Sequence, residues 1–226
     1  MSRGKIYDLG CGNGALAKAL KARVGERDLV GVDASPAMLE KARQTKAYNT
    51  LQQADIRDWH PKGAPGMIFS NAALHWVGEH EKLMPRLASM LVKGGTLAVQ
   101  LPHQNKAPSH RVWLSLVEEM FPGRVEKMGT PGVMAPVKYE ELLSNKGQFR
   151  MWETEYYQRL KAEGGSHPVR RFTESTYARP VLQALDEDEK ADLIRRYEEV
   201  MHAAYPVRRD GSVLFPFRRL FFTLTV

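Results

Sequence analysis

Three aspartates and a run of glycines near the N-terminus have the types and spacing to hold a ligand. Asp8 ends a short apolar run and is followed by three glycines at alternate positions within 10–14. Glycine at every second position lets the backbone turn sharply and lets a ligand approach main-chain N–H groups. Asp33 and Asp55 close the next two strand-like runs. The spacing predicts a nucleotide-binding corner in which acids surround a glycine loop.

The glycine loop alone leaves the nucleotide open. Residues 10–15 also satisfy the G-x-G-x-x-A dinucleotide pattern, which would make the chain a nicotinamide-dependent oxidoreductase that binds NAD. Asp8 argues against this, because a carboxylate at the strand end would repel a pyrophosphate and tolerate a cationic amino-acid group. Asp33 is suited to bind both hydroxyls of a ribose, and Asp55 to contact an adenine amino group. Together the acids favour a cationic ligand that carries adenosine over the simpler interpretation that they only cap helices.

The elements that would position these residues alternate between short apolar strands and helices. We expect strands at 5–9, 28–33, 49–53, 66–71 and 96–101. Helical patterns lie between them at 15–24, 35–43 and 79–91. Ser35 and Pro36 are typical of an N-cap and a first helical position. This alternation predicts a parallel sheet with helices on both faces, and such sheets bind ligands at the carboxyl ends of their strands.

The pattern changes after Pro102. We expect helices at 109–121, 137–145, 175–185 and 187–204, a loop at 123–136, and late strands at 148–160 and 213–226. The predicted fold is α/β, with a doubly wound, mostly parallel, seven-stranded Rossmann-like sheet and a helical cap over its C-terminal edge. Residues 1–102 would form the cofactor-binding core. Residues 103–226 would supply the cap helices and the two last strands.

Composition narrows the partners. The chain has 226 residues, a formal net charge of +7 and a single cysteine. Its basic residues are dispersed and no nucleic-acid-binding motif occurs, so we expect no nucleic-acid partner. No apolar run approaches the roughly 20 residues that span a bilayer, and no signal peptide is evident, so we expect no membrane partner and a cytoplasmic location. The sequence leaves the oligomeric state open, with a monomer slightly favoured.

Several motifs, in this order, resemble those of class I S-adenosylmethionine-dependent methyltransferases. They are the segments 8–14, 32–38, 54–56 and 70–76. The resemblance implies S-adenosyl-L-methionine as cofactor, with the glycine loop near its methionine part, Asp33 on the ribose, and Asp55 and Ile56 beside the adenine. The cofactor-binding residues expected on this basis are Asp8, Gly10, Cys11, Gly12, Asn13, Asp33, Ala34, Ala54, Asp55, Ile56, Asn71, Ala72 and Leu74.

A narrower resemblance, to the trans-aconitate 2-methyltransferase family, runs almost to the C-terminus. It rests on the segments 54–59, 71–76, 99–102, 108–110, 152–157, 179–180 and 219–221. It implies esterification of one carboxylate of a small polycarboxylic acid. The chain departs from the family at 103–104, 171–178 and 217–219, and it starts at the first strand where the family has a preceding helical segment. These departures concern the substrate side more than the chemistry.

The implied reaction asks little of acid–base chemistry. A carboxylate is already ionised near neutral pH, so no catalytic residue is required beyond in-line alignment, which contributes roughly 7–11 kcal/mol. Arginine is the expected substrate partner, because its planar fork binds carboxylates bidentately. Arg179 and Arg219 match arginines of the family, and His75, His110 and Tyr139 are secondary candidates. No His, Cys, Asp or Glu spacing suggests a metal site.

Other functions remain open from the sequence. The chain could methylate a different small molecule, or use the glycine turn as an NAD-dependent oxidoreductase. It could also be a degenerate methyltransferase that binds the cofactor without turnover.

Overall fold

The computed structural model describes residues 4–124, 132–162 and 164–226. The chain forms two compact units. Unit 1 comprises residues 1–102, 132–153 and 220–226, and unit 2 comprises residues 103–131 and 154–219. Unit 1 is therefore assembled from three stretches of the chain.

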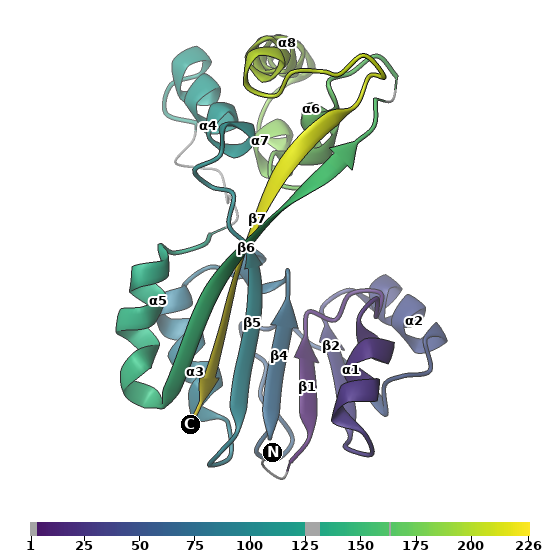
Figure 1. Cartoon of the computed structure of the whole chain (residues 1–226), viewed down its shortest axis with the longest axis vertical. Helices are drawn as coiled ribbons and strands as arrows, with labels where there is room; N and C mark the ends of the chain where they lie inside the picture. The colour runs from purple at the N-terminus through teal and green to yellow at the C-terminus, as the bar shows by residue number, and fades with distance from the viewer. Residues whose placement is uncertain (1–3, 125–131, 163) are drawn as a thin grey trace. The chain divides into compact units, whose positions relative to one another are not determined.

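A seven-stranded sheet in the order β3-β2-β1-β4-β5-β7-β6 is the main feature (Figure 1). Its strands are β1 Ile6–Leu9, β2 Leu29–Asp33, β3 Thr50–Gln53, β4 Met67–Asn71, β5 Thr96–Pro102, β6 Gln148–Leu160 and β7 Val213–Thr225. The pairs β1–β2, β1–β4, β2–β3 and β4–β5 are all parallel. The sequence-based prediction of a doubly wound, mostly parallel α/β sheet is confirmed, since the strand order reverses direction at β1 and β4.

The long strands β6 and β7 contribute to both units. In unit 1, the Trp152 ring of β6 stacks on the Phe221 ring of β7, with centroids 5.4 Å apart. In unit 2, Arg218 of β7 pairs with Glu155 of β6 at 3.1 Å. Contacts therefore join earlier residues of β6 to later residues of β7, which is the register of an antiparallel pair.

Unit 1 contains four α-helices in its described residues, and the start of the second shows the clearest cap. They are α1 Ala17–Val24, α2 Pro36–Gln44, α3 His80–Ser89 and α5 Pro136–Leu143, with short 3₁₀ turns η1 Leu74–Trp76 and η3 Ser144–Lys146. The Ser35 side chain accepts a hydrogen bond from the Met38 backbone N–H at 3.3 Å, with Pro36 at the first helical position. The predicted start of this helix is confirmed.

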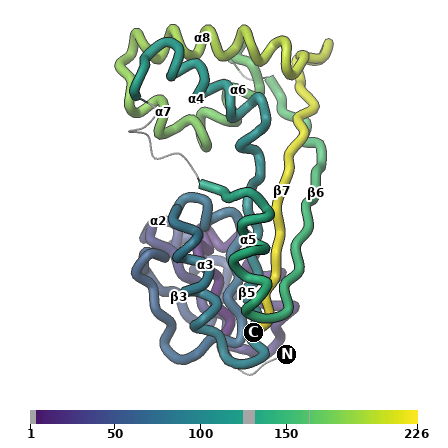
Figure 2. The backbone as a smooth tube through the Cα atoms, turned by 90° about the vertical axis from the view of Figure 1, so that its left-hand side faces the viewer, coloured from purple at the N-terminus to yellow at the C-terminus, as the bar shows by residue number. Residues whose placement is uncertain are grey.

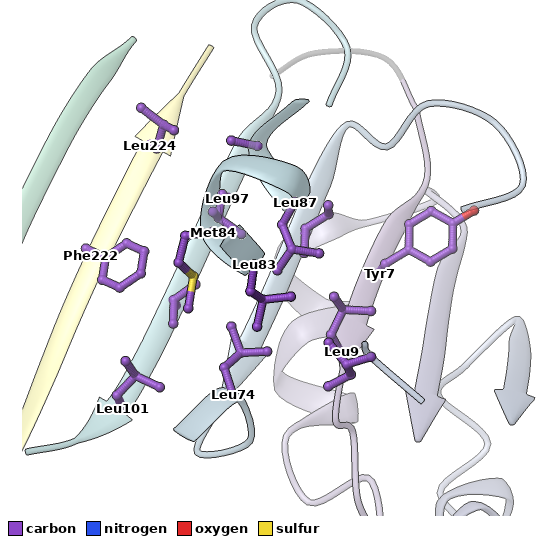
Figure 3. Close-up of a cluster of buried hydrophobic side chains, with 14 of the residues drawn as sticks. Tyr7, Leu9, Leu74, Leu83, Met84, Leu87, Leu97, Leu101, Phe222 and Leu224 are labelled. Atoms are coloured by element: carbon purple, nitrogen blue, oxygen red, sulfur yellow. The ribbon is translucent and has the colours of Figure 1, made fainter. Parts of the chain in front are cut away.

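The hydrophobic core of unit 1 lies between the sheet and α3 and α5. Figure 3 shows Leu83, Met84 and Leu87 of α3 among side chains of β5 and β7. Tyr139 and Leu143 of α5 are also fully buried in this cluster. Each such aliphatic side chain contributes about 1.5–3 kcal/mol on burial. This packing holds the strand ends that carry the candidate cofactor residues.

Unit 2 consists mainly of helices (Figure 2), and its buried cluster also includes Val213, Phe215 and Phe217 of β7. Its helices are α4 Pro108–Met120, α6 Pro168–Glu174, α7 Arg179–Gln183 and α8 Glu187–Ala204. The Trp113 ring of α4 stacks on Tyr197 of α8 with centroids 3.7 Å apart. Asp186 and Glu189 form a reciprocal capping box at the start of α8. No helix in the described part of the chain is long and apolar enough to cross a membrane.

The predicted helix at 175–185 is wrong in its extent. The structure has α6 before it and the short α7 within it, separated by a turn at 175–178. His167 caps α6 by accepting from the Val169 N–H at 3.3 Å, with Pro168 at the first helical position. Pro180 then starts α7 anew, because proline suits a first helical turn and disfavours a helix interior. Part of the expected loop, 125–131, lies outside the described residues.

Candidate functional site

The glycine loop joins β1 to α1 in unit 1. The N–H groups of Gly10 and Cys11 both donate to the Val32 carbonyl, at 2.8 and 3.0 Å, which ties the loop to the end of β2. Gly10 has a positive φ of 72°, and a Cβ there would lie 2.2 Å from the Cβ of Ala73. Only glycine fits this position, because the loop packs directly against the chain after β4.

Gly12 and Asp33 meet at the open side of the loop. The Gly12 N–H donates to Asp33 Oδ2 at 2.8 Å, and the Ser35 N–H donates to Oδ1 at 2.9 Å. A Cβ added at Gly12 would have nothing within 4 Å. The loop therefore exposes a backbone edge that a ligand can approach, beside a carboxylate at the end of β2. This combination fits an adenosine-bearing cofactor whose ribose hydroxyls need an acceptor.

Asp8 is buried beneath the loop. Its exposed fraction is 4%, and the Tyr48 hydroxyl donates to its Oδ2 at 2.6 Å. Burial, with the nearby charge of Asp33, raises the pKa of Asp8 to about 6, while the Tyr48 hydrogen bond opposes the rise. The same burial raises the pKa of the Cys11 thiol to about 12, so this cysteine stays protonated. The structure gives Asp8 a hydrogen-bond donor, Tyr48, that the sequence did not indicate. That Asp8 lies near the ligand stays a prediction.

The end of β3 presents Ala54, Asp55 and Ile56. The Ala54 N–H donates to the Asp33 carbonyl at 3.1 Å, which joins this segment to the end of β2. The Asp55 carboxylate accepts from the Arg57 side chain, with Nη2 to Oδ2 at 2.6 Å and Nε to Oδ1 at 3.0 Å. These hydrogen bonds lower the pKa of Asp55. Asp55 is therefore ionised and paired with Arg57. An adenine amino group that donated to this carboxylate would share it with the Arg57 guanidinium.

The chain after β4 has an unusual backbone. Ala72 has a positive φ of 52°, a conformation that costs a residue with a Cβ about 1–2 kcal/mol, and its N–H donates to the Gln100 carbonyl at 3.0 Å. Asn71 before it is half-buried, and Leu74 and His75 after it are buried in η1. Strain of this kind concentrates at functional sites. Ala73 of the segment 71–75 lies against Gly10, which places this segment beside the glycine loop.

Tyr139, expected among the substrate-binding residues, lies in the hydrophobic core of unit 1. Its exposed fraction is 0%, and its oxygen is 2.6 Å from His80 Nδ1 and accepts from the Met134 N–H at 3.3 Å. His80 Nε2 lies 2.9 Å from the Leu74 carbonyl. A carbonyl only accepts, so Nε2 carries the proton, and burial lowers the pKa of His80 and keeps the ring neutral. The Tyr139 hydroxyl then donates to Nδ1.

His110, Arg179 and Arg219 all lie in unit 2. His110 is buried in α4, with its Nδ1 3.0 Å from the Oγ of the preceding residue, Ser109. Burial lowers the pKa of His110 to about 4. Arg179 is exposed at the start of α7. Arg219 is half-buried in β7. Its Nε donates to the Tyr156 hydroxyl at 2.8 Å, and its guanidinium lies 4.8 Å from the Phe217 ring centroid.

The structure groups the expected cofactor residues and divides the expected substrate residues. The expected cofactor residues lie in unit 1, at or just after the carboxyl ends of β1, β2, β3 and β4. His75 and Tyr139 belong to unit 1, and the other three substrate candidates to unit 2. Sequence reasoning missed Tyr48 and His80, because a lone tyrosine before a strand and a lone histidine at a helix start carry no motif. Within the described residues, no three His, Cys, Asp or Glu side chains gather to hold a metal ion.

Comparison with known proteins gives this geometry a context. The family described as "Methyltransferase domain" matches residues 6–95. A trans-aconitate 2-methyltransferase of Pseudomonas aeruginosa is 34% identical, over 96% of this chain and 81% of the relative. A trans-aconitate 2-methyltransferase of an Azoarcus species is 37% identical, over 96% of this chain and 85% of the relative.

Solved structures share the fold. The YcgJ protein of Bacillus subtilis has a TM-score of 0.59 at 16% identity, over 99% of this chain and 92% of its own. A phosphoethanolamine N-methyltransferase of Haemonchus contortus, solved with S-adenosyl-L-methionine, has a TM-score of 0.52 at 16% identity, over 99% of this chain and 49% of its own. At these identities the likeness concerns the fold alone.

Proposed function

We propose, because the chain belongs to the trans-aconitate 2-methyltransferase family of S-adenosylmethionine-dependent methyltransferases, that it methylates a carboxylate of trans-aconitate. The observation that supports this most strongly is identity of 34–37% to enzymes of that name along 96% of the chain. Similarity confined to the cofactor-binding part would support only the methyltransferase activity. Here it extends through unit 2, which holds three of the substrate candidates.

The cofactor is S-adenosyl-L-methionine. We infer that it is held by the glycine loop, Asp33 and the segments after β3 and β4. The open position at Gly12 and the acceptor oxygens of Asp33 support this set. Asp33 accepts hydrogen bonds from two backbone amides, which orient its carboxylate at the strand end. A carboxylate fixed in this way can accept from ribose hydroxyls with little loss of side-chain entropy.

The chemistry needs orientation more than proton transfer. When bound, S-adenosyl-L-methionine supplies an electrophilic methyl group on a positively charged sulfur. The acid substrate is ionised near neutral pH, so the protein need not remove a proton from it. The chain's contribution is to bind the carboxylates, align the attacking oxygen and exclude water, and alignment of this kind is worth roughly 7–11 kcal/mol.

Arg219 is the substrate residue that we favour most. Its guanidinium is packed against Tyr156 and Phe217, and one N–H is fixed by the Tyr156 hydroxyl. A half-buried, stacked guanidinium keeps its planar fork in a defined orientation, which suits bidentate binding of a carboxylate. His75, His110 and Arg179 remain secondary proposals. The burial of Tyr139 supports a structural role for that residue.

The proposal is tested by incubating the purified protein with S-adenosyl-L-methionine and trans-aconitate and following the monomethyl ester by mass spectrometry. Arg219→Lys keeps the charge but loses the planar fork, so we expect KM for the acid to rise about tenfold while affinity for S-adenosylhomocysteine is unchanged. Arg195→Lys, on an exposed face of α8, is the matched control. If no monomethyl ester of trans-aconitate forms at any concentration of S-adenosyl-L-methionine, the proposed activity is contradicted.

Cofactor titration separates the alternatives. Binding of S-adenosylhomocysteine without binding of NAD supports the methyltransferase, and the reverse result supports the oxidoreductase. A degenerate module would bind S-adenosylhomocysteine and methylate no organic acid. These outcomes differ in the ligand bound or in turnover, so each hypothesis is addressed separately.

A further inference from the structure

Tyr48 holds a place under the glycine loop that no motif assigns to it. It precedes β3, and its ring lies against Gly14 of the loop and Gly31 of β2. A Cβ at Gly14 would be 3.2 Å from Tyr48 Cε2, and one at Gly31 would be 3.0 Å from Cε1. The half-buried ring therefore lies against the loop at Gly14 and against β2 at Gly31. From this position its hydroxyl reaches Asp8 Oδ2 at 2.6 Å.

We propose that the Tyr48 hydroxyl is a positioning residue for the cofactor site, which keeps the buried Asp8 carboxylate ionised and oriented toward the cationic amino-acid end of S-adenosylmethionine. The inference rests on the proposed cofactor site. A 2.6 Å hydrogen bond from a hydroxyl to a carboxylate is strong and favours the charged form of the acid.

The surroundings of Asp8 explain why such a donor is needed. The carboxyl has an exposed fraction of 4%, so it has little water to stabilise its charge. The negative charge of Asp33 also favours the protonated form of Asp8, while the nearby Cys11 thiol stays protonated and adds no charge. Tyr48 is the group that opposes both burial and Asp33. Without its O–H, the carboxyl would hold its proton to higher pH.

The consequence for binding is a dependence on pH. A protonated Asp8 offers no charge to an ammonium group, so affinity for S-adenosylhomocysteine should fall as pH drops through the pKa of Asp8, about 6. In Tyr48→Phe the ring still fills its place and only the hydroxyl is lost. Loss of the hydroxyl raises the pKa of Asp8, so a smaller fraction of the carboxyl is ionised at pH 6.5 and binding there should be about threefold weaker. The defect should disappear by about pH 8.5, where Asp8 is ionised in both proteins.

The experiment measures S-adenosylhomocysteine affinity from pH 5.5 to 9 by calorimetry for the natural protein and Tyr48→Phe. The control is Tyr7→Phe, which removes a hydroxyl that donates to the Lys62 carbonyl at 3.2 Å. Tyr7 precedes Asp8 in β1, so the two side chains point to opposite faces of the strand. We expect about threefold weaker binding at pH 6.5 in Tyr48→Phe alone, restored at alkaline pH. Equal weakening at every pH, or no weakening, would overturn the proposal.

A second measurement needs no cofactor. Carbon NMR of the side-chain carboxyl, assigned with Asp8→Asn, follows the titration of Asp8 in the unliganded protein. We expect its midpoint to move upward in Tyr48→Phe and to stay in place in Tyr7→Phe. An unchanged midpoint in Tyr48→Phe overturns the inference whatever the protein binds. A moved midpoint in a protein that fails to bind S-adenosylhomocysteine would instead contradict the proposed function.

Discussion

Asp33 satisfies two backbone amides at once, and this double role governs what its replacement should do. One amide belongs to Gly12 in the glycine loop and the other to Ser35 at the start of α2. A ligand hydroxyl approaching the same carboxylate would therefore meet a group that is already oriented. The sequence indicated an acid at this strand end, and the two amides explain why its orientation is defined before a ligand binds.

Asp33→Ala should weaken S-adenosylhomocysteine binding by at least about 1–2 kcal/mol, because charged hydrogen bonds to the ribose are lost. Calorimetry measures the change, with circular dichroism to confirm that the fold is kept. Asp28→Ala is the matched control, since Asp28 precedes the other end of the same strand and pairs with Lys5 at 3.3 Å on the surface. Unchanged affinity in Asp33→Ala would remove Asp33 from the proposed site.

Asp8 makes a prediction about stability. Its pKa in the folded protein, about 6, is above its ordinary value of 3.8, so the folded state binds this proton more tightly than the unfolded state does. Stability from this group is therefore present below about pH 4 and is lost as pH rises through about 6, in total about 3 kcal/mol. Asp8→Asn should remove that loss.

Urea unfolding of both proteins at several pH values between 4 and 7.5 checks this. The free energy of unfolding of Asp8→Asn should rise relative to that of the natural protein as pH increases through the window. Differences between the two proteins that do not vary with pH would show that Asp8 is not buried as described.

At the scale of elements, the glycine loop and the chain after β4 constrain each other. Gly10 contacts Ala73 so closely that a Cβ cannot be added, whereas Gly12 faces open space. The sequence predicted the strand, loop and helix of this corner because their signals are local: an apolar run, alternating glycines and good helix formers. The contact to Ala73 could not be predicted, because it joins residues that are distant in the chain.

This contrast predicts different effects for two similar substitutions. Gly10→Ala should destabilise unit 1 and abolish cofactor binding, because its Cβ would lie 2.2 Å from that of Ala73. Gly12→Ala should cost only about 1–2 kcal/mol of stability for its positive φ, yet weaken S-adenosylhomocysteine binding by blocking the approach to the loop. Thermal unfolding and calorimetry separate the two effects. Equal behaviour of the two variants would contradict the loop geometry.

The hydrogen bonds of Tyr139 and His80 link α5 and α3 to η1. The sequence-based hypothesis assigned Tyr139 to the substrate, since neither the helix pattern nor the composition shows that its hydroxyl has a buried partner. His80 Nδ1 and the Met134 N–H meet at that oxygen, and His80 Nε2 reaches the Leu74 carbonyl. The network fixes the position of η1 beside the strand ends.

Tyr139→Phe should therefore act on stability more than on substrate binding. The buried His80 Nδ1 and the part-buried Met134 N–H would lose their partner, which costs about 1–3 kcal/mol. We expect a lower urea midpoint and a KM for the acid within about twofold of the natural value. Tyr157→Phe, on an exposed position of β6, is the control for loss of a tyrosine hydroxyl. A large rise in KM at unchanged stability would return Tyr139 to the substrate site.

At the scale of the whole molecule, the chain leaves unit 1 after β5 and returns to it twice. The alternating pattern of the first hundred residues made the parallel half of the sheet predictable. The late strands β6 and β7 were predicted as strands, but their division between two units depends on which residues pack together over long sequence separations. Whether unit 2 serves as the substrate cap stays a prediction.

The substrate side is least defined by sequence for the same reason. Arg179 precedes a proline at a helix start, and Arg219 lies within an apolar strand. Neither local pattern indicates how far the side chain lies from a reacting atom. Only Arg219 proves to be half-buried and fixed by neighbouring rings. Its fixed guanidinium makes it the sharper candidate for recognising a carboxylate.

The central claim is methyl transfer to trans-aconitate, and it is tested most directly with a methyl-labelled donor and a panel of small carboxylic acids. The panel contains trans-aconitate, its cis isomer, citrate and a dicarboxylate, each assayed with the natural protein and with Asp33→Ala. We expect label in a base-labile ester of trans-aconitate, at a rate well above that for the other acids and strongly reduced in Asp33→Ala. Label in none of the acids, or in another acid but not in trans-aconitate, would contradict the account.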